Sequence, residues 1–86
     1  MKATLNAQEL TSRKEAHAAI ARALDFPDYY GGNLDALFDM LSTIEAELTL
    51  VNTPALLAHL EGYGMRLIRT MEEAAQENPG FKLNLE

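Results

Sequence analysis

The residues best placed for chemistry are two aspartates, Asp35 and Asp39, which lie four positions apart in the run FPDYYGGNLDALFDML (26–41). On a helix this spacing puts both carboxylates on one face, where two like charges cost roughly 0.2–0.5 kcal/mol. Paired carboxylates can perform acid/base catalysis, hold a hard cation or bind the cations of a partner. Sites of the first two kinds usually draw side chains from several elements around a cleft. A pair on one exposed helical flank favours the third use.

Other side chains with chemical potential occur without a recognisable pattern. They are Ser12, His17, Ser42 and His59. The sequence has no H-E-x-x-H motif, no glycine-rich phosphate loop and no nucleophile elbow around either serine. We therefore assign solvated or capping roles to these residues, and we predict no catalytic residue, no metal site and no cofactor.

Two tyrosines and two glycines, Tyr29 to Gly32, directly precede the aspartates. Neighbouring side chains of an extended loop point opposite ways, so we expect one tyrosine to pack on the core and the other to face solvent. The glycines either form a turn that needs positive φ or let a partner approach bare backbone, and both can hold together. An outward tyrosine beside two aspartates and the ring of Phe38 is typical of a protein-binding patch.

Charge is distributed unevenly along the 86 residues, whose formal net charge is −6. Residues 23–65 contain seven Asp and Glu but no Lys or Arg. This acidic block is either an ordinary solubilising surface or a surface for a basic partner. Direct nucleic-acid binding requires clustered Lys and Arg, so we expect none.

Length and composition indicate one domain, residues 1–86, with 48% hydrophobic residues and no cysteine. Disulfides and thiolate metal sites are thereby excluded. No apolar run approaches the ~20 residues of a membrane span, and residues 1–30 lack the features of a signal peptide. We predict a cytoplasmic protein that is a monomer when free.

The first half of the sequence predicts a strand and two helices. The strand covers Lys2–Asn6. Helix 13–24 begins at Thr11 or Ser12, with Glu15 completing a capping box, and Phe26-Pro27 ends it. Asn33 caps helix 34–43, whose apolar stripe leaves Asp35 and Asp39 on its flank.

The second half predicts two strands separated by two helices. These are strand 48–51, helix 54–61 with Thr53 as its cap, helix 65–77 after breaks at Gly62 and Gly64, and strand 81–85 with Phe81, Leu83 and Leu85 inward. Two helices separate each pair of consecutive strands, which suits parallel crossovers. The predicted fold is therefore α/β, a small three-stranded parallel sheet with four helices in the order β-α-α-β-α-α-β, with one sheet face less covered.

The run from Pro27 to Asp39 resembles the signature of the barstar family, intracellular protein inhibitors of secreted, barnase-type ribonucleases. Ten of thirteen positions match: Pro27, Tyr29-Tyr30-Gly31, Asn33-Leu34-Asp35-Ala36-Leu37 and Asp39. Length and predicted element order are also similar. The resemblance implies a barstar-like fold and a non-enzymatic inhibitor with a basic ribonuclease as its partner.

The resemblance also implies roles for individual residues. Asp39 is expected to stand in for an RNA phosphate and Asp35 to pair with active-site cations, while Tyr29 and Phe38 supply apolar contact. Glu73 matches the family's additional acidic contact. The full partner-binding set that we predict is Tyr29, Gly31, Asn33, Leu34, Asp35, Ala36, Phe38, Asp39, Ser42, Thr43 and Glu73.

Some positions depart from the family pattern. Phe38 stands where tryptophan is usual, and Thr43-Ile44 replace a glycine and a tryptophan. Glu47-Leu48 replace an expected proline, so no cis bond is expected there. Glu72 is acidic where a basic residue is familiar, which leaves open whether Glu72 or Glu73 makes the contact. The changes at Phe38, Thr43 and Ile44 keep open an immunity or regulatory protein for a different basic partner. The aspartate pair separately keeps open a small metal-dependent hydrolase.

Overall fold

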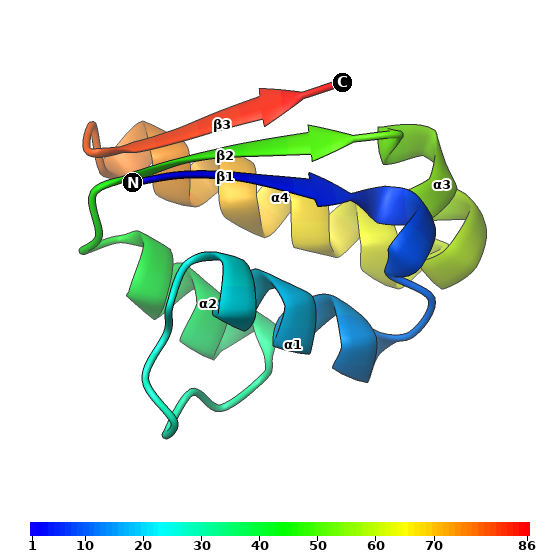
Figure 1. Cartoon of the computed structure of the whole chain (residues 1–86), viewed down its shortest axis with the longest axis horizontal. Coiled ribbons are helices and arrows are strands. Elements are labelled where there is room, and N and C mark those ends of the chain that lie inside the picture. Colours follow the sequence, from blue (N-terminus) through cyan, green and yellow to red (C-terminus); the bar gives the residue numbers. More distant parts are fainter.

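The computed structural model describes all residues from 1 to 86 and contains one sheet and four α-helices (Figure 1). In chain order the elements are β1 (Lys2–Asn6), the short 3-10 helix η1 (Ala7–Glu9), α1 (Arg13–Ala23), α2 (Leu34–Leu41), β2 (Ala46–Val51), α3 (Thr53–Leu60), α4 (Gly62–Glu77) and β3 (Phe81–Leu85). This confirms the predicted order, and the first and last strands have the predicted bounds. No helix is both long and apolar enough to cross a membrane.

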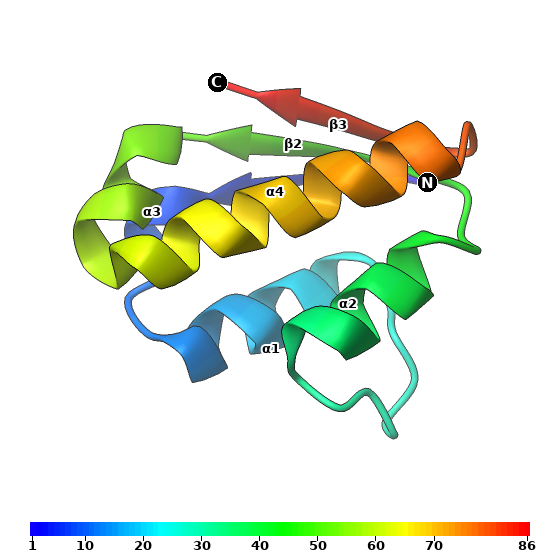
Figure 2. The ribbon, with the colours of Figure 1, turned by 180° about the vertical axis from the view of Figure 1, so that it is seen from behind.

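The sheet is parallel, with strand order β1-β2-β3. The helices pack on one of its faces, so the opposite face is open (Figures 1 and 2). Residues of β2 alternate accordingly: Ala46, Leu48 and Leu50 are buried, whereas Glu47, Thr49 and Val51 are only half-buried. Alternation of this kind is what a sheet covered on one side requires, and it confirms the expectation of one less covered face.

Leu85 was predicted to point inward, but it is exposed. Phe81, at the other end of β3, is buried. Figures 1 and 2 show the reason: α4 lies close to the start of β3 and diverges from the strand toward the C-terminus. The end of this edge strand therefore lacks a covering helix, and only part of the predicted apolar face is used.

Helix α1 ends before the proline that was expected to stop it. Asp25 has the left-handed φ of 56°, and the Phe26 N–H donates to the Ala21 carbonyl at 2.9 Å. This is the hydrogen bond of a Schellman ending, with a non-glycine residue in the left-handed position. The prediction that Phe26-Pro27 ends the helix was therefore wrong in its cause, because the chain has already turned at Asp25.

The junction of α3 and α4 also differs from the prediction. Asn52, not Thr53, occupies the cap position of α3, without a side-chain cap bond. Gly62 and Gly64 do not break the chain but lie inside α4, while the break falls at Glu61, with φ 52° and ψ −127°. A Cβ at position 64 would lie 2.8 Å from the Leu56 carbonyl oxygen. The glycine is thus explained by the close approach of α3 and α4.

The end of α2 is fixed to the end of α4 by one side chain. The Asn78 amide donates to the carbonyls of Leu41 and Ile44, at 2.9 and 2.8 Å. Helix α2 ends at Leu41, two residues before the predicted Thr43, and the Thr43 N–H donates to the Met40 carbonyl at 3.3 Å in a tighter turn. Together with the packing of α2 on α4, this bridge holds α2 in a defined position on the molecule.

Candidate functional site

Helix α2 is held from one side and open on the other. Leu37 and Leu41 are completely buried and anchor it in the core. At its start, the Asn33 side-chain oxygen accepts a hydrogen bond from the Ala36 N–H at 2.8 Å, which confirms the predicted cap. Asp35 and Asp39 are both exposed. The four-residue spacing places them on the same side of the helix, as expected.

The two carboxylates have no hydrogen-bonding partner within the chain. The side-chain bonds around α2 are made by Asn33, Ser42 and Thr43, and the two hydroxyls donate to helix carbonyls. No group of three or more His, Cys, Asp or Glu side chains is arranged to hold a metal ion. The pair therefore lacks the additional ligands that the hydrolase alternative would need from other elements.

Of the two tyrosines before α2, one faces solvent and the other packs on the core, as predicted. Tyr29 is 81% exposed. Tyr30 is half-buried, packs its ring edge-on against Phe26 with 4.9 Å between centroids, and lies 2.7 Å from the His17 ring through its hydroxyl. Gly32 has a φ of 67° and open space around it, whereas Gly31 has no positive φ. Only Gly32 is needed for the turn, so Gly31 is available as bare backbone.

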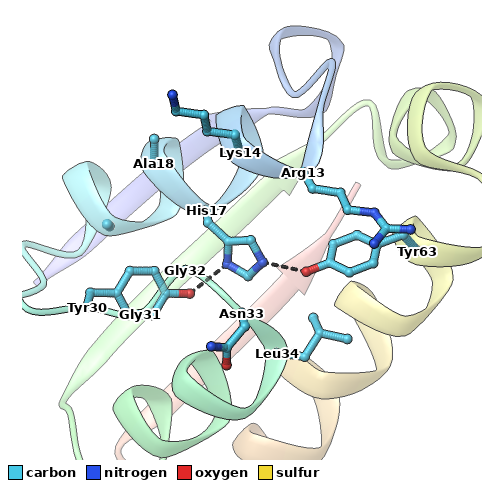
Figure 3. Close-up of a pocket in the computed structure, with 11 residues that line it drawn as sticks. Arg13, Lys14, His17, Ala18, Tyr30, Gly31, Gly32, Asn33, Leu34 and Tyr63 are labelled. Carbon is cyan, nitrogen blue, oxygen red and sulfur yellow. Dashed lines mark hydrogen bonds between the residues drawn. The ribbon is translucent and has the colours of Figure 1, made fainter.

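His17 lies at the centre of a hydrogen-bonded cluster that the sequence did not reveal (Figure 3). The residue is only 4% exposed, and its two ring nitrogens lie 2.7 Å from the Tyr30 hydroxyl and 2.6 Å from the Tyr63 hydroxyl. The solvated or capping role predicted for His17 was therefore wrong. A usable signal was its position, three residues before the apolar Ile20 and seven before Leu24, which places it on the buried side of α1.

Burial determines the protonation of this cluster. It lowers the pKa of His17, and together with the nearby Tyr63 it raises the pKa of Tyr30 above its ordinary value. A neutral imidazole has one donor and one acceptor nitrogen. One tyrosine must therefore donate to the ring while the other accepts from it. The cluster ties the loop before α2 to both α1 and α4.

Beside this cluster lies a hollow of about 650 Å³. Its walls come from Arg13 and Lys14 on α1, from Tyr63 on α4 and from the segment 30–34 (Figure 3). None of its eleven lining residues is Asp or Glu. Residues 23–65 contain no Lys or Arg in sequence, but the fold places two cations of α1 directly beside the loop that leads into α2.

The remaining predicted residues lie along or near α2. Leu34, Ala36, Phe38 and Ser42 are half-buried, and Thr43 and Glu73 are exposed. Phe38 packs against the core, so only part of its ring faces outward. Asp35 and Asp39, which we call the acidic ledge of α2, are therefore flanked by apolar surface that is continuous with the core.

Helix geometry shows which of two exposed glutamates on α4, Glu72 or Glu73, lies on the side of α2. Tyr63 marks the side of α4 that faces α1, and α1 and α2 lie along the same side of α4 (Figures 1 and 2). At 100° per residue, Glu72 lies roughly 180° around the helix from Tyr63, and Glu73 only about 80°. Glu73 is thus the one nearer to α2.

Comparisons with known proteins cover the whole chain. The family model described as "Barstar (barnase inhibitor)" matches residues 1–86. A protein of Bacillus subtilis (strain 168) named "Putative ribonuclease inhibitor YrdF" is 34% identical over 89 residues, covering 99% of this chain and 98% of that relative. Both matches extend over essentially the full length of the chain. The chain belongs to the barstar family.

Proposed function

We propose that this chain is a non-enzymatic inhibitor that covers the active site of a barnase-type ribonuclease with α2 and the loop before it. The observation that carries the proposal is the pair Asp35 and Asp39, exposed side by side on a capped helix and without an internal partner. The family match and the naming of the Bacillus relative as a ribonuclease inhibitor support this class of target.

Carboxylates suit such a target because a ribonuclease holds RNA phosphates with cationic side chains. A carboxylate presents negatively charged acceptor oxygens to the same donors and forms short, charge-assisted hydrogen bonds with them. Asp35 lies in the first turn of α2, where the helix dipole stabilises it. Asp39 lies a turn further on and lacks that compensation. By its match to the family signature, Asp39 is the central phosphate mimic in this proposal, with Asp35 as the second ionic contact.

The neighbouring residues complete the contact surface in this proposal. Tyr29 extends from the loop as an aromatic anchor, and Gly31 allows the backbone of the enzyme to come close. Phe38 contributes the outward part of its ring. The rest of the surface is formed by Asn33, Leu34, Ala36, Ser42 and Thr43. Glu73 adds a further acidic contact from α4, because it lies on the side of that helix nearer to α2, whereas Glu72 does not.

The proposal is tested by inhibition of barnase at rising ionic strength. Exposed acidic groups that approach a basic groove accelerate association, and salt screens this effect. We expect the association rate constant to fall as salt rises and Asp39→Ala to inhibit much more weakly than the wild type. The matched control is Glu9→Gln, which removes an exposed carboxylate from η1. An association rate independent of salt, or full inhibition by Asp39→Ala, contradicts the proposal.

A second candidate is the same fold directed at a different basic protein, as an immunity or regulatory protein. It is favoured by the end of α2, where Phe38 and Ile44 are partly buried against the core and offer less surface than two exposed indoles would. Affinity capture with the wild-type chain and with Asp39→Ala distinguishes the two candidates. A basic protein without nuclease activity, captured only by the wild type, favours the second.

A further inference from the structure

Two arginines share one aromatic ring at the wall of the hollow. The guanidinium carbon of Arg13 lies 4.3 Å from the centroid of the Tyr63 ring, and that of Arg66 lies 5.4 Å from it. Figure 3 shows Arg13 stacked on this ring. Both distances are within the range of cation–π attraction, which holds the two cations in place. They come from different helices, α1 and α4, and both side chains are exposed.

The surroundings of these cations do not neutralise them. The chain has thirteen acidic and seven basic residues, yet the lining of the hollow includes Arg13 and Lys14 and no carboxylate. Arg13 and Lys14 are also the first two residues of α1. There the positive end of the helix dipole disfavours each cation. The start of α1 therefore does not stabilise these two charges, and no carboxylate lines the hollow to pair with them.

The polar groups beside the arginines add a further donor. The neutral His17 ring accepts one hydroxyl proton and donates one proton to the other tyrosine. The tyrosine that accepts keeps its own hydroxyl proton free. Because Tyr30 and Tyr63 both line the hollow, this proton is available there. At the hollow, the Arg13 guanidinium, the Lys14 ammonium and this hydroxyl supply donors and positive charge, which is the chemistry that binds an anion. Arg66 does not line the hollow but lies against the same Tyr63 ring as Arg13.

We propose that Arg13 and Arg66, held on the ring of Tyr63, form a receptor for a carboxylate of the bound ribonuclease. This inference rests on the proposed function. The hollow shares Gly31, Gly32 and Asn33 with the loop that docks on the enzyme, so an enzyme seated there reaches the edge of the hollow. The binding surface is then bipolar, with an acidic ledge on α2 and a basic site beside its loop. The fitting target has a basic groove flanked by an acidic side chain.

The receptor is tested by removing its positive charges and measuring whether the affinity for barnase falls or rises. Removing any positive charge from an acidic inhibitor strengthens its long-range attraction to a basic enzyme, so a variant without a local contact binds barnase equally well or more tightly. Arg66→Gln, Arg13→Gln and the double variant are expected to raise Kd instead, by about three- to thirty-fold for each single change. Arg69→Gln is the matched control, because it removes the same charge from an exposed position on the same helix and has no cation–π contact with Tyr63.

The outcomes separate the two proposals. Weakening by Arg66→Gln but not by Arg69→Gln supports the receptor. If Asp39→Ala weakens binding and all arginine variants bind as tightly as the wild type or more tightly, the receptor is refuted while the proposed function stands. If even the wild type fails to bind barnase, both proposals fail for this class of enzyme.

A titration of the free chain with inorganic phosphate and with acetate tests whether a small anion, rather than a carboxylate of the enzyme, binds at Arg13 and Arg66. Tight phosphate binding that the double arginine variant abolishes, combined with unchanged affinity of that variant for barnase, assigns the site to a free anion and overturns the partner carboxylate. Weak binding of both small anions, with reduced affinity of the double variant for barnase, supports the partner carboxylate.

Discussion

The outer flank of α2 and the His17 cluster use polar side chains in opposite ways, although one short loop joins them. On the flank, Asp35 and Asp39 are exposed and have no partner in the chain. In the cluster, both His17 nitrogens are hydrogen-bonded in a buried position. Polar groups satisfied inside a fold contribute to its stability, whereas charges left free at the surface are available to a second molecule. Of the two adjacent tyrosines, the exposed Tyr29 belongs with the flank and Tyr30 belongs to the cluster.

Removing a charge from the flank is expected to give the largest effect, and to give it on binding. Asp39→Ala should weaken the complex with barnase by about 2–5 kcal/mol, a range to which measurements on the barnase–barstar complex itself contribute. The unfolding free energy of the Asp39→Ala variant should rise by about 0.5 kcal/mol, because a like-charge pair disappears and alanine favours helix. Inhibition assays and urea denaturation measure the two quantities. A loss of stability that parallels the loss of binding contradicts this separation.

Removing the centre of the cluster should affect stability instead. His17→Leu leaves the hydroxyls of Tyr30 and Tyr63 without their partner, which should lower the unfolding free energy by about 1–3 kcal/mol. Tyr63→Phe keeps the ring and is the milder control, because it removes a single hydrogen bond. Affinity for barnase, measured at a temperature where both variants are folded, should change much less than in Asp39→Ala. A His17→Leu variant as stable as the wild type rules out a structural role for the cluster.

The cluster also predicts a pH dependence of stability. Burial holds the pKa of His17 below its ordinary 6.5, so the unfolded chain binds the proton more readily, and stability should fall as pH drops below about 6.5. The pKa of Tyr30 is raised above 10.0, mainly by burial, so the unfolded chain releases that proton first. Stability should therefore also fall as pH rises above about 10.

Urea denaturation across this pH range checks both limbs. In His17→Leu the contribution of His17 to the acid limb disappears, and the slope of stability against pH below about 6.5 should become shallower. The contribution of Tyr30 to the alkaline limb should disappear in Tyr30→Phe. An acid slope that is identical in the wild type and in His17→Leu shows that other groups cause it.

These two regions also differ in how far the sequence predicts them. Asn33, Asp35 and Asp39 lie within seven residues, and helix periodicity alone places the cap and the two carboxylates correctly. The cluster joins residues 13 and 46 positions apart, His17 with Tyr30 and with Tyr63. No local pattern encodes such a pairing. Sequence reasoning therefore assigned His17 a solvated or capping role, although its spacing to Ile20 and Leu24 places it on the apolar side of α1.

Gly64 shows the same limit of prediction from local sequence. Gly64 was expected to break the chain because glycine is flexible, but it lies inside α4 where α3 leaves no space for a side chain. Both uses of glycine look identical in the sequence, and only the contact with Leu56 distinguishes them. Strand and helix order, in contrast, followed from local periodicity and from the length of the connections between strands.

The smallest expected effect distinguishes two adjacent glutamates of α4. Glu73→Gln and Glu72→Gln remove the same charge from neighbouring exposed positions, so their long-range effects on a basic enzyme should be nearly equal. Any difference between them reports local contact. Glu73 lies on the side of α4 nearer to α2, and an exposed ion pair there is worth about 0.2–1 kcal/mol, so Glu73→Gln should dissociate about two- to five-fold faster than Glu72→Gln. Equal dissociation rates would limit the ionic contact surface to α2 and its loop, and a faster rate for Glu72→Gln would place the enzyme on the opposite side of α4.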